Sequence, residues 1–243
     1  MPTLRAFVWR RHDFRESSRV VALVTRDEGR IHVLAKGAHR PGSQFLGRLD
    51  FLNLVDATCS AGGDRLRLLS RVTLVHEPRA LRTPARFAAA AHVAELVDHL
   101  FHDGRPDPSA FDLLAGALTL VERCPKRALP RVVAGFELRF LALLGVLPAF
   151  DRCSACGRTS RELFAESRSL ALHCATHAQH RAPLRPSALH WLATTDVAPG
   201  RTWPTLADVD GADAALALLG EWVATTLERR PRLRALALAE SRG

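Results

Sequence analysis

The sequence predicts an α+β protein: a small N-terminal β-barrel, then helices, with a short cysteine-containing segment inserted among the helices. Three observations predict this class. Short runs rich in β-branched residues fill residues 1–80. From Thr83 onward, apolar residues recur at helical spacing. Two pairs of potential metal ligands then interrupt the helical pattern between residues 148 and 182.

Five strands are predicted in residues 1–80, with a loop rich in Gly, Pro and Ser (37–47) after the third. Five short strands with this loop favour a small closed barrel. The oligonucleotide-binding (OB) barrel is one such architecture, and an SH3-like barrel fits the strand count nearly as well. The expected strands are Leu4–Arg11, Arg19–Thr25, Arg30–Lys36, Leu49–Ser60 and Leu66–His76.

The helical part is expected to begin at Thr83, which suits an N-cap, with Pro84 at the first helical position. We expect this first helix to end at Gly104. Further helices are predicted at Ser109–Arg123, Arg131–Leu144, Ser187–Thr194 and Gly211–Arg230. The Arg131–Leu144 segment is apolar almost all round, so it should be central to the helical core. The expected domains are a barrel (1–80), a helical domain (81–147 and 183–243) and an inserted segment (148–182).

The inserted segment carries Cys153 and Cys156, followed by Cys174 and His177. A two-residue gap lets both members of a pair reach one ion from a tight turn, and zinc takes four such ligands in a tetrahedron. His173 and His180 are neighbours that could replace His177. Cys153 and Cys156 alone would also fit a redox pair. Two pairs favour zinc, and four protein ligands leave no open position, so the zinc would be structural.

The net charge of +9 favours polyanionic partners, either nucleic acid or an anionic membrane surface. Basic residues exceed acidic ones by six in residues 1–80 and by three in the rest. No apolar run approaches the length of a membrane span. The only lysines, Lys36 and Lys126, follow Ala35 and Pro125, so no nucleotide-binding Gly-Lys-Ser/Thr loop exists. We therefore expect a nucleic-acid-binding protein of the reducing cytosol and not an enzyme.

Basic residues of the predicted barrel alternate with aromatic ones, as single-strand binding requires. Each aromatic taken alone is better explained as a core residue, and the charges could form a solvated surface. The Gly-rich run Lys36–Arg40 favours phosphate contact. The DNA-binding candidates are Arg10, Arg11, Arg15, Arg30, Lys36, His39, Arg40 and Arg48, and the aromatic residues are Phe7, Trp9, Phe14, Phe45 and Phe51.

Two stretches resemble the bacterial RecO family of recombination mediators. The first contains Val20–Thr25, Gly29-Arg30 and Leu34–Arg40, and it is similar to the opening of that family. The second runs from Phe136 through Leu143–Pro148 to Asp151–Gly157, and it resembles the family's central helix leading into a zinc-binding segment. The resemblance implies an N-terminal OB barrel and a helical domain with an inserted zinc segment.

The resemblance also implies binding of single- and double-stranded DNA, and annealing of complementary strands without nucleotide hydrolysis. It implies help in loading RecA onto strands coated by single-strand-binding protein (SSB), with RecR and the acidic, apolar C-terminal tail of SSB as partners. The expected location is the cytoplasm, with the nucleoid. In the family the second ligand pair is usually C-x-x-C, whereas this chain has Cys174 and His177.

For the SSB tail, the resemblance implies an apolar groove flanked by arginines in the helical domain. Arg127, Arg131 and Arg139 are candidates by location, and a solvated helix face explains them equally well. The alternative function is a zinc-containing transcription regulator that reads duplex DNA. Such a protein needs a recognition helix with exposed base-reading side chains, whereas the predicted helices face a core.

Overall fold

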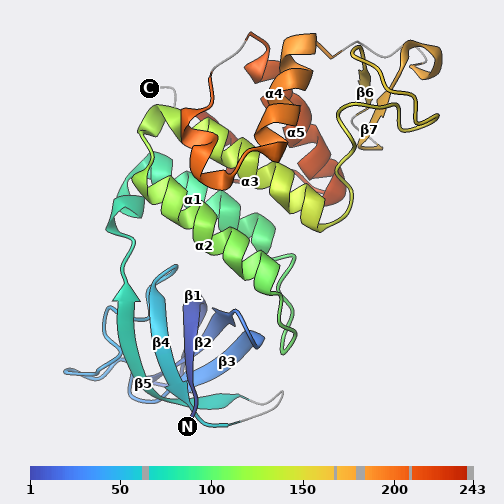
Figure 1. Cartoon of the computed structure of the whole chain (residues 1–243). Coiled ribbons are helices and arrows are strands. Elements are labelled where there is room, and N and C mark those ends of the chain that lie inside the picture. Colours follow the sequence, from blue (N-terminus) through green and yellow to red (C-terminus); the bar gives the residue numbers. More distant parts are fainter. Residues whose placement is uncertain (62–65, 167–168, 179–183, 208–209, 240–243) are drawn as a thin grey trace. The chain divides into compact units, whose positions relative to one another are not determined.

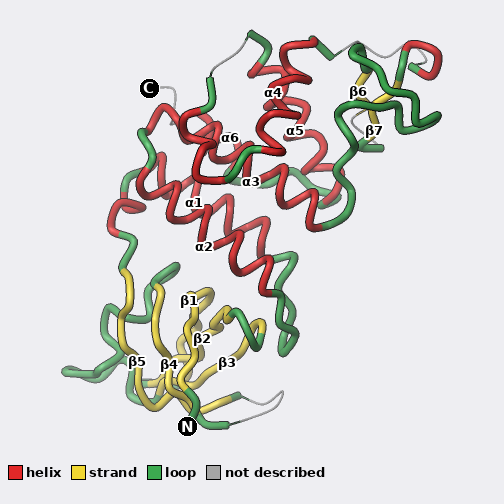
Figure 2. Tube along the Cα trace, in the orientation of Figure 1, coloured by secondary structure: helices red, strands yellow, loops and turns green. Residues whose placement is uncertain are grey.

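The computed structural model describes residues 1–61, 66–166, 169–178, 184–207 and 210–239. These residues form two units. One contains residues 1–82 and 97–114, and the other contains residues 83–96 and the chain from Ala115 onward. Strands dominate the first unit and helices the second (Figures 1 and 2).

Five strands close into a barrel in the order β1-β2-β3-β5-β4. Their bounds are β1 Thr3–Phe14, β2 Ser18–Thr25, β3 Gly29–Ala35, β4 Leu54–Cys59 and β5 Arg67–His76. The β3–β5 pair is parallel, and the other pairs are antiparallel. This arrangement is that of a five-stranded OB-like barrel. The predicted α+β class, with an N-terminal OB barrel followed by a helical region, is confirmed.

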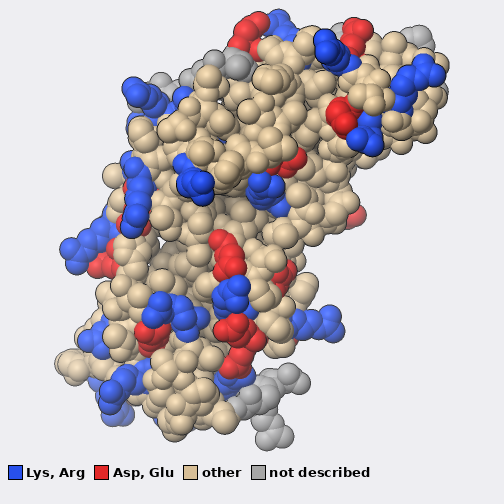
Figure 3. Space-filling model, viewed as in Figure 1, with Lys and Arg blue, Asp and Glu red and all other residues tan. Residues whose placement is uncertain are grey.

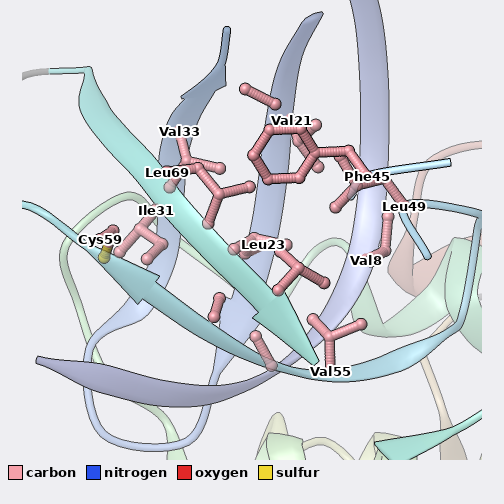
Figure 4. Packing of buried hydrophobic residues seen from close by; sticks show 14 of the residues in the cluster. Val8, Val21, Leu23, Ile31, Val33, Phe45, Leu49, Val55, Cys59 and Leu69 are labelled. Atoms are coloured by element: carbon pink, nitrogen blue, oxygen red, sulfur yellow. The ribbon is translucent and has the colours of Figure 1, made fainter. Parts of the chain in front are cut away.

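The interior of the barrel is filled by alternate residues of its strands. Val8 of β1, Val21 and Leu23 of β2, and Val33 of β3 point toward one another (Figure 4), and all four are almost completely buried. Because successive side chains of a strand point to opposite faces, the residues between them point out of the barrel.

Phe7 and Trp9 of β1 point out of the barrel and are nevertheless buried. The Phe7 ring lies 5.3 Å from that of Phe111, and the Trp9 ring lies 6.0 Å from that of Phe101. Both partners belong to the 97–114 segment, which is therefore part of the barrel unit. These two aromatic residues serve as a second core on the outside of the barrel.

The largest differences from the predicted boundaries concern two elements, the fourth strand and the first helix. The fourth strand begins at Leu54, because the preceding residues form turns in which Leu52 has a φ of +66°. Helix α1 (Pro84–Val97) ends before Gly104. Gly104 instead donates its N–H to the carbonyl of Arg30, 3.0 Å away, and Arg30 donates to the carbonyl of His102. Residues 102–105 thus pair with the start of β3, and we call them the strap.

Helix α3 (Leu129–Leu143) is the centre of the helical unit. It contacts α4 (Pro186–Val197), α5 (Ala212–Thr226), α6 (Arg234–Ala239) and the 3₁₀ helix η4 (Gly200–Thr205). At Gly135, a Cβ would lie 2.2 Å from the Trp203 ring, so only glycine allows this approach of α3 and η4. Three further helices are α2 (Pro108–Arg123), η2 (Lys126–Ala128) and, in the barrel unit, η1 (Arg79–Arg82).

A charged group lies inside this helical core. Glu137 of α3 is fully buried, and it accepts hydrogen bonds from His92 of α1 at 2.7 Å and from Arg234 of α6 at 2.7 and 2.9 Å. Burial alone would raise the pKa of Glu137, but the charge and hydrogen bonds of Arg234, with the bond from His92, hold that pKa below its usual value. The carboxylate therefore joins α1, α3 and α6.

A small two-stranded sheet, β6 (Phe164–Glu166) and β7 (Ala171–His173), follows α3 and leads into the 3₁₀ helix η3 (Ala175–His177). Among the described residues, none of the helices is both long and apolar enough to span a membrane.

Candidate metal centre and nucleic-acid interface

Cys153, Cys156, Cys174 and His177 converge on one point. Their Sγ and ring nitrogen atoms all lie within 4.8 Å of one another. The Nδ1 atom of His177 is 3.3 Å from Sγ of Cys174 and 3.8 Å from Sγ of Cys153. The sulfur atoms of Cys156 and Cys174 are 4.0 Å apart. The cluster therefore brings together the two pairs that the spacing predicted.

Two tight turns place these ligands. In the first, the N–H of Gly157 bonds to the carbonyl of Cys153 at 2.9 Å, and Gly157 has a φ of +70°, which glycine adopts without strain. In the second, the N–H of His177 bonds to the carbonyl of Cys174 at 2.9 Å. The N–H of Ser154 bonds to the carbonyl of Leu172 in β7 at 2.7 Å and ties the first turn to the small sheet.

The surroundings favour thiolates, the form that binds metal. A backbone hydrogen bond from Cys174 lowers the pKa of Cys153 to about 5. The side-chain hydrogen bond with His177 lowers the pKa of Cys174 and raises that of His177. The backbone hydrogen bond from Arg158 favours the Cys156 thiolate, but burial and the two neighbouring cysteines outweigh it, so the pKa of Cys156 is instead raised. Thiolate is thus favoured at two of the three cysteines.

The spacing of the four atoms fits a tetrahedral ion. With zinc–sulfur bonds of about 2.3 Å, the edges of a tetrahedron are about 3.8 Å long. Three of the six separations, 3.3 to 4.0 Å, lie close to this value, and all six are within 4.8 Å. This cluster could hold a metal ion and is compatible with zinc. The Nε2 atom of His173 contacts Glu166 at 3.2 Å instead, and His180 lies outside the described residues.

Three of the predicted DNA-binding cations border one surface hollow of the barrel unit. Arg15, Lys36 and Arg40 line this hollow of about 680 Å³, together with the neutral residues Phe14, Ser17, Ser18, Leu34 and Gly37 and one acidic residue, Glu16. The turn between β1 and β2 supplies one wall, and the Gly-rich loop supplies the other. An N–H to carbonyl bond from His39 to Ser17, 3.1 Å long, joins the two walls. We call this the basic hollow.

The other predicted DNA-binding residues already contact partners within the barrel unit. Arg10 bonds to Asp98 and Arg11 to Asp50. Arg30 has a side chain only 17% exposed and bonds to Asp98 and to the carbonyl of Phe101. Two further contacts are Arg48 with the carbonyl of Val72 and His39 with Asp13.

Acidic and basic side chains are interspersed over the face of the barrel that Figure 3 shows. This pairing of arginines with carboxylates was not predicted from the sequence. Asp98 is 88 residues from Arg10, so no local pattern reveals the contact. Asp13 is the one acidic residue between Arg10 and Arg15 in the sequence. Its position among these arginines is the only local feature that indicates an ion pair.

Of the five aromatic residues considered for base stacking, only Phe14 and Phe51 are exposed. Phe45 fills the barrel interior, while Phe7 and Trp9 pack against the 97–114 segment. Phe14 borders the basic hollow, and the guanidinium carbon of Arg15 lies 5.4 Å from the centre of its ring.

The three arginines considered for partner binding lie on or beside α3. Arg127 is exposed on η2. Arg131 donates to the carbonyl of Leu206 at 2.8 Å, and Arg139 donates to the carbonyl of Ala198 at 3.2 Å.

Two family models match successive parts of the chain. Residues 1–78 match the family described as "Recombination protein O N terminal", and residues 81–235 match "Recombination protein O C terminal". The chain belongs to the RecO family. Together the two RecO regions account for nearly the whole sequence and span both the barrel and the helical unit.

Individual relatives agree with the family match. A DNA repair protein RecO of Rhodopirellula baltica is 37% identical over 155 residues, which cover 63% of this chain and 57% of that protein. One of Anaeromyxobacter dehalogenans is 35% identical over 156 residues, covering 63% and 61%. One of Cutibacterium acnes is 36% identical over 165 residues, covering 65% and 67%. The matched part thus spans about 60% of the length of the first two relatives.

Proposed function

We propose that this protein acts in DNA repair by homologous recombination. It binds single- and double-stranded DNA, anneals complementary strands without ATP, and, together with RecR, helps to load RecA onto single strands coated by SSB. The observation that carries the DNA-binding part is the basic hollow, where three cations surround one opening on an OB-like barrel. Family membership and the names of the relatives support the repair role.

The basic hollow suits a phosphate backbone in two ways. Arg15, Lys36 and Arg40 outnumber its single acidic residue, so the local field attracts anions. The hydroxyl groups of Ser17 and Ser18 supply additional hydrogen-bond donors. These contacts carry no base information, because phosphates are the same in every sequence. Exposed Phe14 at the border adds a face on which a base can stack.

Charge neutralisation is the physical basis of annealing in this proposal. Two DNA strands repel each other through their phosphates, and a protein that neutralises phosphates on both strands lowers this repulsion. Each phosphate contacted also releases counterions, so binding weakens with salt. Contact with about five phosphates of a single strand gives a slope of about −3.5 in a plot of log affinity against log salt concentration.

The Cys153, Cys156, Cys174 and His177 cluster is proposed to hold a structural Zn²⁺ ion. Four protein ligands leave no position for substrate, and the two turns that carry them come from segments about 20 residues apart in the chain. Zinc would therefore fix the fold of the inserted segment (148–182), which in the chain separates the two parts of the proposed helical domain (81–147 and 183–243); the proposed barrel domain is residues 1–80. We retain Arg127, Arg131 and Arg139 as candidate contacts of the SSB tail.

The test is annealing of complementary single strands coated with the cognate SSB, without ATP and at two salt concentrations. Salt-sensitive annealing by the wild-type protein is the expected result. If the protein binds the strands but does not anneal them, the proposed mediator function is contradicted, and the protein would only bind DNA. Affinity that does not change with salt would remove the electrostatic mechanism.

A further inference from the structure

Two carboxylates lie beside the basic hollow: Glu16 lines it, and Asp13 contacts the Gly-rich loop that forms one of its walls. Asp13 of β1 is the cross-strand partner of Arg19 in β2. Its Oδ1 atom accepts a hydrogen bond from Nε of Arg19 at 3.0 Å and another from Nε2 of His39 at 2.9 Å. His39 belongs to the Gly-rich loop that forms one wall of the hollow. A single oxygen atom of Asp13 therefore joins a strand cation to the basic loop.

The exposure of Asp13 shows that fold stability is not its main contribution. Its side chain is 68% exposed, against 22% for Arg19 and 33% for His39. Ion pairs this exposed add little to the free energy of folding, because water screens both charges. The hydrogen bond from Arg19 keeps the pKa of Asp13 below its usual value, so the carboxylate is ionised at neutral pH. Its charge is thus permanent and faces solvent.

We infer that Asp13 is a built-in competitor for DNA phosphate: it occupies the anion position between Arg19 and His39 and so weakens the hold of the basic hollow on nucleic acid. A phosphate oxygen needs the same donors that Asp13 Oδ1 already uses. A strand that crosses this edge must either displace the carboxylate or pass close to its negative charge.

This inference rests on the proposed function and deepens it. A protein that brings two strands together must also release the duplex that results. A negative charge beside the phosphate contacts shortens the lifetime of the complex, since affinity differences at one site mostly reflect dissociation rates. Asp13 therefore adjusts the balance between capture and release.

The test replaces Asp13 by Asn, which keeps the shape of the side chain. Its amide oxygen can accept the same two hydrogen bonds, so the loop keeps its position while the charge is lost. We expect D13N to bind single-stranded DNA about three- to tenfold more tightly, with a salt slope more negative by about 0.7 for each further phosphate contacted. Slower release of annealed duplex should accompany the tighter binding.

D56N is the matched control. Asp56 of β4 also pairs with an arginine of β1, Arg5, so the net charge changes equally. Arg5 lies eight residues before Asp13 in β1, about 26 Å at about 3.3 Å per residue. At physiological salt, screening acts over about 8 Å, so D56N should change DNA affinity by less than about twofold. An increase that D13N shares with D56N would reflect net charge and would overturn the inference.

The outcomes separate this inference from the proposed function. Absence of DNA binding by the wild-type protein contradicts the proposed function itself. D13S, which removes the charge with a smaller side chain, is the second variant. Tighter binding by either variant supports the inference. Wild-type binding with neither D13N nor D13S tighter than the wild type contradicts only the role of Asp13, and weakening of both would assign it to loop positioning.

Discussion

At the scale of single residues, the metal cluster makes a prediction that separates two neighbouring histidines. We expect one zinc ion per chain, and we expect His177→Gln to lower zinc affinity by more than about tenfold, because it removes a ligand. His173→Gln should retain the ion, because Nε2 of His173 contacts Glu166 instead of facing the cluster. Zinc content and competition with a chromogenic chelator measure both variants.

A loss of zinc in His173→Gln with retention in His177→Gln would assign the fourth ligand differently from the geometry described above. Equal loss in both variants would point to collapse of the small sheet, which circular dichroism would reveal.

The basic hollow makes the second prediction at this scale. Lys36→Glu and Arg40→Glu should each weaken binding to single-stranded DNA about tenfold or more, since each replaces a charge-assisted phosphate contact with repulsion. The loss should be equal for all DNA sequences. Fluorescence anisotropy with several oligonucleotides measures it, and Arg201→Glu, an exposed arginine of η4 in the other unit, is the control. Sequence-selective weakening would contradict phosphate contact.

Some of these residue-level features could be read from the sequence, and others could not. The spacing of Cys153 and Cys156 and of Cys174 and His177 predicts a metal-ligand cluster, because each pair is local. It leaves the choice among His177, His173 and His180 open. The partners of the basic residues were not predictable, because Asp98 and Arg10 meet only through the tertiary fold.

At the scale of secondary-structure elements, the strap along β3 depends on one glycine. Gly29 has a φ of +68°, and a Cβ there would lie 2.1 Å from the carbonyl oxygen of Arg105. Gly42 has a similar φ of +74° but no atom within 4 Å of the added Cβ. Gly42→Ala should cost about 1–2 kcal/mol for the left-handed backbone, and Gly29→Ala about 1–3 kcal/mol more, because the strap must move. Urea unfolding measures both.

Equal destabilisation by the two glycine substitutions would mean that the strap moves without loss of folding free energy.

The same segment shows where prediction of helix boundaries from the sequence fails. The helical periodicity of the sequence correctly predicts α1, but it places the end of this helix at Gly104 instead of Val97. The chain leaves the helix at Val97, because residues 98–105 pack against the barrel strands. A tertiary contact, absent from any local pattern, sets that boundary.

At the scale of the whole molecule, the buried Glu137 predicts how stability depends on pH. Its pKa is lowered in the folded state, so its contribution is fully present above the unfolded value of about 4.3 and is lost as pH falls through the lower folded value. At neutral pH, Glu137→Gln should destabilise the helical unit by about 3–5 kcal/mol, because Arg234 loses its partner. This difference should shrink below about pH 4.

Urea unfolding followed by helical circular dichroism at pH 7 and in acid measures this dependence. Asp210→Asn is the control, since Asp210 pairs with Arg185 at an exposed position and should cost less than about 1 kcal/mol. A destabilisation by Glu137→Gln that is the same at every pH would mean that the charge of the carboxylate is irrelevant and only its packing matters.

The buried Glu137 also affects when the helical unit can finish folding during protein synthesis. Arg234, its cationic partner, lies 97 residues later in the chain. At about 5–20 residues per second, the ribosome needs about 5–20 s to make that stretch. Throughout this interval, Glu137 lacks the guanidinium group whose charge lowers its pKa in the folded protein. The helical unit can therefore reach its final core only after translation of Arg234, whereas the strands of the barrel are complete much earlier.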